Sequence, residues 1–248
     1  MRFSQAWIVA TKDFATFTKK KNIIYSVLIV PFVVSIALPG VIWYVQHRSN
    51  GATVGAAELS ILLPAFSFFF LALAGFLPTT IASYSLVGEK IEKSIEPLLA
   101  TPTTDGEILF GKGIAAFVPP MGAILGSSVL FMVLMDVFTH DLLGYYYFPN
   151  WNSAALLFIG VPLAVVMSVE WNVFISSRVS DVRIAQQLGV IVMLPLAGMY
   201  VGGEVGIVPL GELSTSLYIA GALAILDLLL LSVVRETFRR DLILTKWK

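Results

Sequence analysis

The sequence contains six long apolar segments, and these constrain the possible fold more than any other feature. A helix needs about 20 mainly apolar residues to cross the hydrocarbon core of a bilayer, because each residue rises about 1.5 Å across roughly 30 Å. The sequence therefore predicts an all-α, polytopic membrane protein with six transmembrane helices, at approximately 23–45, 59–87, 113–135, 153–176, 188–202 and 216–234.

Two of these segments depart from a simple span. The second is long enough either to tilt or to break near Pro78. The fifth is short and carries Pro195 and Gly198, so we expect it to begin earlier, near Ile184.

The composition excludes several other classes of protein. Charged residues make up 13% of the chain, against roughly 25% in soluble domains. There is no cysteine, which excludes disulfides and thiolate chemistry, and two histidines are too few for a histidine-rich metal cage. We find no hydrolase or metalloprotease motif, and predict no catalytic residue, metal site, bound cofactor or nucleic-acid partner for this chain.

The basic residues predict the orientation. Fifteen of the 16 Lys and Arg residues fall in the N-terminal segment, in loops 88–112 and 177–187, and in the tail from Arg235 onwards. Basic residues favour the cytoplasmic side. We therefore expect both termini and these two loops to be cytoplasmic, in a multi-pass protein of a cell membrane with short external loops and no cleaved signal peptide.

The N-terminal segment 1–22 predicts an interfacial helix ahead of the membrane domain 23–248. Its apolar residues recur at helical spacing, while Lys12 and Asp13 lie mostly elsewhere around the helix. Such a helix lies flat at the membrane surface. The residues of this apolar side are Phe3, Trp7, Ala10, Phe14 and Phe17.

Loop 88–112 holds eight of the chain's 32 charged residues. Ile91, Ile95, Leu98 and Leu99 recur at i, i+4, i+7 and i+8, which indicates one face of a short amphipathic helix. Pro97 argues for a break or restart within that helix, and the pattern ends at Thr101-Pro102. Its apolar face would rest on the protein's own membrane helices or would dock a soluble partner, and composition does not separate these two alternatives.

The end of the loop, GEILFGKG (106–113), nearly fits a phosphate-binding loop. Gly113 stands where that motif needs a hydroxyl for magnesium, and no strand precedes it. We therefore expect Lys112 to mark the point where the chain re-enters the bilayer, with its ammonium at the lipid headgroups.

The loop sequence EKIEKSIEPLLATPTTDGEILFGK (89–112) resembles the cytoplasmic loop of type-2 ABC-transporter permeases. The likeness is carried by the LLATP core and by the closing EIL-x-GK. Lys93-Ser94 stands where that family usually has Gly-Thr. SSRVSDVRIAQQ (176–187) is similar to the family's second cytoplasmic loop.

The resemblance implies the permease subunit of an ATP-driven exporter in a prokaryotic cell membrane. Two chains, identical or related, would pair among the membrane lipids, and a separate cassette ATPase would bind ATP and Mg²⁺. A coupling helix at 89–101 would insert into that ATPase, with Ile95, Leu98 and Leu99 as its apolar plug and the glutamates as its rim. The implied coupling residues are Glu89, Glu92, Ile95, Glu96, Leu98, Leu99, Thr101 and Pro102, and those of the connecting helix are Phe3, Trp7, Phe14 and Phe17.

Two acidic residues fall inside predicted spans, where ionisable groups are costly. Glu170 and Asp227 could line a translocation path or pair across a dimer. Alternatively, Glu170 reaches the lipid headgroups and Asp227 hydrogen-bonds a neighbouring helix. We also expect Asn172 to form a hydrogen bond between helices. The alternative function is a small ion-coupled transporter that uses one of these acids, and a scaffold or lipid-processing enzyme is less favoured.

Overall fold

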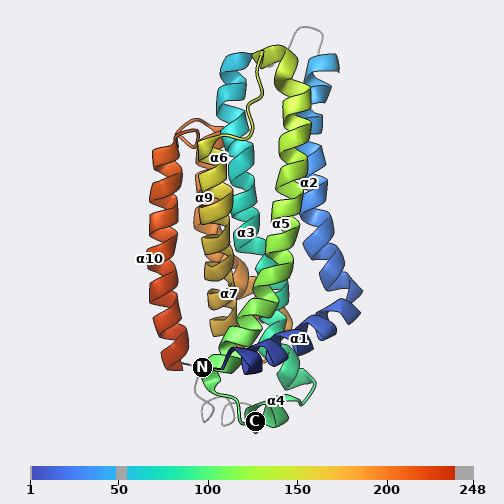
Figure 1. Ribbon diagram of the computed structural model, residues 1–248, viewed down its shortest axis with the longest axis vertical. Helices are drawn as coiled ribbons and strands as arrows, with labels where there is room; N and C mark the ends of the chain where they lie inside the picture. Colours follow the sequence, from blue (N-terminus) through green and yellow to red (C-terminus); the bar gives the residue numbers. More distant parts are fainter. Residues whose placement is uncertain (1, 49–54, 238–248) are drawn as a thin grey trace.

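The computed structural model shows an elongated helical bundle and describes residues 2–48 and 55–237 (Figure 1). Within these residues it contains helices and no strand, and six stretches are long and apolar enough to cross a membrane. The six predicted spans are thereby confirmed, as they lie in Ile23–His47, Ala56–Ile91, Asp105–Leu143, Trp151–Arg178, Val182–Glu204 and Leu213–Glu236.

Helix α3 (Ala56–Ile91) is the centre of the bundle. In its most apolar part 72% of the residues are buried, against 17% for the span Val182–Glu204. It packs against α2 (Lys21–Arg48), α5 (Asp105–Leu143) and the fourth and fifth spans. Helix α3 runs unbroken past Pro78, so the second span does not break there.

The fourth and fifth spans are each assembled from several helical pieces. The fourth joins α6 (Trp151–Ala155), a π-helical turn and α7 (Val161–Arg178). The fifth joins α8 (Val182–Gly189), a 3₁₀ turn and α9 (Leu194–Glu204). It begins at Val182, close to the earlier start that we expected.

Asn172 of α7 hydrogen-bonds α3 inside the core. Its Oδ1 accepts from the Ser83 hydroxyl at 2.9 Å, and its Nδ2 donates to the Thr79 hydroxyl at 3.2 Å. This confirms the predicted helix-to-helix bond. Gly189 lies so close that a Cβ there would be 1.9 Å from Asn172 Oδ1, so α8 can approach only without a side chain at that position.

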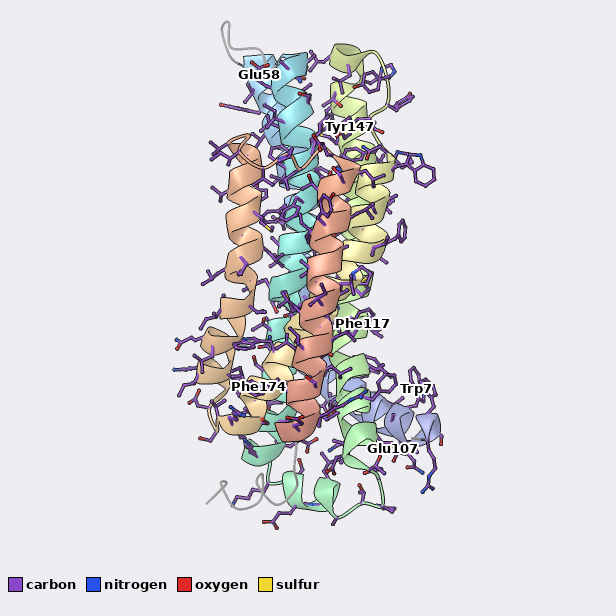
Figure 2. The ribbon with its side chains drawn as sticks, turned by 90° about the vertical axis from the view of Figure 1, so that its left-hand side faces the viewer. Trp7, Glu58, Glu107, Phe117, Tyr147 and Phe174 are labelled. Carbon is purple, nitrogen blue, oxygen red and sulfur yellow. The ribbon has the colours of Figure 1, made fainter. Side chains whose placement is uncertain are left out.

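The predicted cytoplasmic segments gather at one end of the bundle. Helix α1 (Phe3–Lys19), α4 (Ile95–Leu99), the first turns of α5 and the last turns of α7 and α10 (Leu213–Thr237) lie there, hereafter the α4 end (Figure 1). Glu58 and Tyr147 lie at the opposite end (Figure 2). The grouping agrees with the distribution of basic residues, while the side of the membrane that the α4 end faces stays a prediction.

Candidate functional site

Helix α1 lies against α5 at a position that requires glycine. The face of α1 formed by Ala6, Val9, Ala10, Asp13 and Phe17 is buried. A Cβ on Gly111 would lie 2.5 Å from the Ala6 carbonyl oxygen and 2.8 Å from Val9 Cβ. The two backbones therefore approach each other closely, and any larger residue at 111 would push α1 away.

The beginnings of α1 and α5 share one capping carboxylate. The Thr104 hydroxyl accepts from the backbone N–H of Glu107 at 3.3 Å, and the Glu107 carboxylate accepts from the Thr104 N–H at 2.9 Å, which is a capping box. The other Glu107 oxygen accepts from the Arg2 N–H at 2.6 Å. One buried side chain thus satisfies backbone donors at the start of two helices.

Lys112, which follows Gly111 on α5, is the centre of a buried charge cluster. Its Nζ lies 3.1 Å from Asp13 Oδ2 of α1 and 3.4 Å from Glu89 Oε1 of α3. It also donates to the Ser85 carbonyl oxygen at 2.9 Å, so each of its three donors has an acceptor. Its side chain is 0% exposed. The expectation that Lys112 reaches the lipid headgroups is therefore wrong: the lysine points into the bundle, where two acids compensate its charge.

Glu89 links this lysine to the loop that follows α3. Lys12 Nζ lies 2.8 Å from Glu89 Oε1, and the Ser94 hydroxyl donates to the second Glu89 oxygen. We call Lys12, Asp13, Glu89, Ser94 and Lys112 the charged junction. Its two acids and two lysines balance in charge. Burial raises the pKa of Asp13 above its usual value, and the neighbouring Lys112 opposes that shift.

The predicted coupling helix is broken, but not at Pro97. Helix α3 continues to Ile91, Lys93 adopts a left-handed conformation with φ of 54°, and α4 spans only Ile95–Leu99. The expected break within segment 89–101 is present, but it lies between Ile91 and Ile95 and not at Pro97. The Ser94 N–H donates to the Glu89 carbonyl oxygen at 2.9 Å, and this bond closes the C-terminal end of α3. Pro97 lies in the first turn of α4, where a missing N–H leaves no bond unmade.

Two coupling residues lie elsewhere than predicted. Glu89 is 6% exposed and belongs to the charged junction, so it does not form an exposed rim. Leu98 is 8% exposed and packs into the main apolar core, so in this chain it is not a free plug. The side chains of Ile95 and Leu99 fall outside the described part of the structure.

An exposed patch remains around α4 after these corrections. We call it the α4 surface, and it consists of Ile91, Glu92, Lys93, Glu96, Pro97, Ala100 and Pro102. Ile91 is 56% exposed, while Thr101 beside the patch is half-buried and donates to the Leu98 carbonyl oxygen. Glu92 also accepts from Lys20 Nζ at 3.1 Å and from the Tyr84 hydroxyl at 3.0 Å. The Lys20 bond holds the pKa of Glu92 below its usual value.

Lys90 attaches the end of α3 to the second loop of the α4 end. Its Nζ donates to the carbonyl oxygens of Ser176, Ser177 and Val179 at 3.1, 3.0 and 2.8 Å. These carbonyls belong to the last turn of α7 and the residue after it, where a helix leaves its acceptors unpaired. Ion pairs and hydrogen bonds of Lys112 and Lys90 thus connect helices α1, α3, α5 and α7 at the α4 end.

A comparison of sequences places this architecture among known proteins. A sequence model described as ABC-2 family transporter protein matches residues 7–232. The chain belongs to the ABC-2 family. It is also 32% identical, over 123 residues, to the ABC transporter permease protein NatB of Bacillus subtilis (strain 168). The matched region covers 46% of this chain and 31% of that permease. The resemblance of loop 89–112 is confirmed at the level of the family.

The apolar residues of α1 in the ABC-2 protein lie in two environments, the core of the bundle and its exposed surface. Phe17 is buried and Phe14 is partly buried against the core, whereas Phe3 is 64% exposed and Trp7 is 47% exposed. Phe3 lies 6.3 Å from Phe110 of α5, measured between ring centroids. Trp7 is drawn at the outer edge of the bundle near Glu107 (Figure 2). The exposed part of this helix fits the lipid contact predicted for it.

Sequence reasoning assigned other roles to Glu89 and Lys112, and it did not indicate that they cluster with Asp13 in the ABC-2 protein. Asp13 looked like part of a polar face, although a lone acid among the basic residues of segment 1–22 was a signal that it has a specific partner. Gly111 and Glu107 gave no indication that they contact α1. Glu170 and Asp227 lie on α7 and α10, which contribute no residue to the charged junction.

Proposed function

We propose that this ABC-2 protein is the permease subunit of an ATP-driven exporter, and that the α4 surface is where a separate ATPase docks. The single observation that carries this proposal is an exposed, charged α4 that protrudes from an ABC-2 family bundle and is fastened to several spans (Figure 1). The partner would bind ATP and Mg²⁺ and hydrolyse the nucleotide.

The charged junction gives this docking surface a mechanical connection to the membrane helices. Lys112 binds α1 and α3 to α5, and Lys90 binds α3 to the end of α7. A force on α4 would therefore move the ends of these helices together instead of bending one loop. Closure of the ATPase on ATP would then favour one of two arrangements of the membrane helices, which is how a ligand shifts a conformational equilibrium.

The assembly and location follow from the same proposal. Two chains, identical or related, would pair in a prokaryotic cell membrane, with both termini and the α4 end in the cytoplasm. The exposed Phe3 and Trp7 would rest in the inner lipid interface. NatB carries the name permease, and the chain spans about a third of its length, so this similarity supports the role of the subunit and not a particular substrate.

Affinity purification from membranes of the native host tests the docking surface. A tagged wild-type chain should retain a protein with ATPase activity. The double variant Glu92→Lys, Glu96→Lys should retain much less of it, because both side chains are exposed at α4. The matched control is Glu58→Lys, an exposed acid at the opposite end of the bundle. Equal retention by the double variant and the control would contradict the proposal.

Reconstitution separates this function from the ion-coupled alternative. The proposal predicts that liposomes holding the permease alone do not accumulate substrate under a proton or sodium gradient. Transport driven by such a gradient without any ATPase would favour the alternative, with Glu170 or Asp227 as the ion site.

A further inference from the structure

A cavity of about 780 Å³ lies between α5, α7 and α10 near the α4 end. Helices α5 and α10 both pack against α7, so α7 forms the back wall of the cavity and the other two helices form its sides. Phe110 of α5 lines the cavity and is 46% exposed. The cavity therefore reaches the surface of the bundle, which faces lipid at the depth of the spans.

The lining of this cavity changes from charged to apolar with depth. Asp105, the first residue of α5, and Arg235, in the last turn of α10, line it at the α4 end. Phe117 of α5, Val166 of α7 and Leu231 of α10 line its deeper part. The stretch of α5 from Asp105 to Phe117 rises about 18 Å, which is close to the hydrocarbon depth of one leaflet, about 15 Å. The cavity thus matches the length and the polarity of one leaflet.

Gly113 of α5 keeps part of this volume open. It lines the cavity, and a Cβ there would have no described atom within 4 Å. Gly111 has to be glycine because α1 lies against it, whereas no described neighbour imposes glycine at position 113. Glycine in the interior of a helix is destabilising relative to alanine. What glycine provides at position 113 is therefore space in the cavity.

Arg235 brings a cation to the mouth of the cavity. Its side chain is exposed, and among the described residues no acid forms an ion pair with it. A guanidinium binds phosphate through two parallel hydrogen bonds. Glu170 also lines the cavity, but its Oε2 is buried, so we assign no ligand contact to that oxygen. Arg235 is therefore the group that a phosphate would meet.

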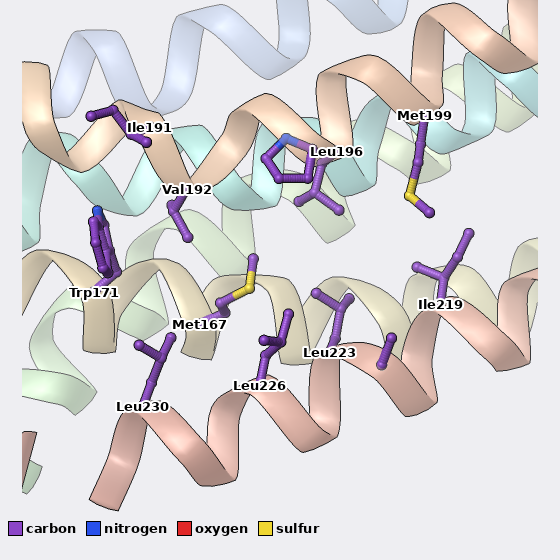
Figure 3. Close-up of a pocket in the computed structure, with 12 residues that line it drawn as sticks. Met167, Trp171, Ile191, Val192, Leu196, Met199, Ile219, Leu223, Leu226 and Leu230 are labelled. Carbon is purple, nitrogen blue, oxygen red and sulfur yellow. The ribbon is translucent and has the colours of Figure 1, made fainter. Parts of the chain in front are cut away.

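A neighbouring pocket lacks such a mouth. It lies between α7, α9 and α10, has a volume of about 370 Å³, and is lined by apolar side chains together with Trp171 (Figure 3). Leu223, Leu226 and Leu230 of α10 enter it, and none of the described residues that line it is charged. This pocket can accommodate hydrocarbon but offers no group to a polar head, so the charged mouth distinguishes the larger cavity.

We propose that the cavity between α5, α7 and α10 binds one zwitterionic phospholipid from the leaflet at the α4 end, with its phosphate at Arg235. One acyl chain lies along Gly113, Phe117 and Leu231. A head group of net negative charge is disfavoured, because two acids, Asp105 and Glu170, line the same cavity. This binding does not rest on the proposed function, since it needs neither an ATPase nor a transported substrate.

Native mass spectrometry of the purified chain, titrated with single lipids in detergent, tests the site. The probe is palmitoyl-oleoyl-phosphatidylethanolamine, and palmitoyl-oleoyl-glycerol is the analogue that has the same chains and no phosphate. The first phosphatidylethanolamine should bind at least about tenfold more tightly than the diacylglycerol, since a hydrogen bond to a charged group contributes about that factor. Equal affinity for the two lipids overturns the proposal without any need for a variant.

Two variants then separate the head group from the chain. Arg235→Gln should weaken phosphatidylethanolamine binding about tenfold and leave the diacylglycerol unchanged. Its control is Arg183→Gln, an exposed arginine of α8 that does not line the cavity. Unchanged phosphatidylethanolamine affinity in Arg235→Gln would overturn the assignment of the phosphate.

Gly113→Phe should weaken the binding of both lipids at least about fivefold, because the new ring fills space that the acyl chain needs. Gly122→Phe is the matched control, since Gly122 also lies on α5 with open space around its Cβ but does not line the cavity. Equal affinities in these two variants would overturn the location of the chain. Because no ATPase is present, failure here would leave the docking experiment at α4 unaffected.

Discussion

Two of the regions of this bundle that hold buried acidic side chains are built in opposite ways. At the charged junction, Lys112 has two acids and a carbonyl as acceptors, and the four charges sum to zero. Between α7 and α10, Asp227 and Glu170 are two acids whose buried oxygens lack donors among the described residues. A compensated cluster fastens helices together, whereas these two acids have no such compensation within the described residues.

The largest expected effect comes from leaving the junction acids without their lysine. Lys112→Met should destabilise the protein by about 3–5 kcal/mol, because it leaves the buried Asp13 carboxylate without its lysine and removes one of the two lysines at Glu89. Lys12→Met is the matched control, since the Lys12 side chain is 49% exposed, and it should cost no more than about 1 kcal/mol. Thermal unfolding in detergent measures the stability of both variants. Equal losses of stability would contradict the difference between the buried Lys112 and the exposed Lys12.

A smaller effect should follow from a methyl group at the α1–α5 contact. Gly111→Ala would place a Cβ 2.5 Å from the Ala6 carbonyl oxygen, and it should cost about 1–3 kcal/mol and increase hydrogen exchange in α1. Gly122→Ala, also on α5, has open space around its Cβ and should stabilise the helix by up to about 1 kcal/mol. A stabilising Gly111→Ala would contradict the close approach of α1.

The two regions should respond with opposite signs when one acid is neutralised. Asp227→Asn should raise the stability of the protein by about 1 kcal/mol, because it removes a buried carboxylate whose oxygens have no hydrogen-bond partner among the described residues. Asp13→Asn should lower the stability, because it removes one of the two carboxylate charges that compensate buried Lys112. The comparison fails if both variants shift the unfolding temperature in the same direction.

The smallest expected effect is at Lys93, whose φ of 54° lies in the left-handed region. Lys93→Gly should stabilise the turn before α4 by up to about 1 kcal/mol, since glycine avoids the Cβ penalty there. Lys93→Ala removes the charge but keeps a Cβ, so it should bring no gain. An equal gain from alanine would assign the effect to charge instead of backbone conformation.

Much of the fold could be predicted because it depends on local patterns. Six apolar segments predicted the six spans, the positions of the basic residues predicted which segments gather at one end, and a polar Asn172 within a span predicted a helix-to-helix bond. In each case the physical cause, transfer into lipid or the need to satisfy a polar group, acts on neighbouring residues of the sequence.

The candidate site could be predicted only in part because its pairs are distant in sequence. Lys112 meets Asp13 across 99 positions and Glu89 across 23, and nothing in the local pattern pairs them. Periodicity placed Leu98 on an apolar face, but it could not decide whether that face turns towards the bundle or the solvent. The break after α3 was assigned to Pro97, while the left-handed residue Lys93 causes the turn. The family usually has glycine at position 93, and this was the signal for a left-handed residue there.

Cross-linking from α4 tests the central claim most directly, and the absence of cysteine from the chain makes it clean. A single Glu96→Cys carrying a photoactivatable cross-linker is introduced into the full chain in its native host, with Glu58→Cys as the matched variant at the other end. The account predicts that Glu96→Cys captures a subunit that binds and hydrolyses ATP, and that Glu58→Cys does not. Capture of that ATPase from position 58, or from neither position, would contradict the account.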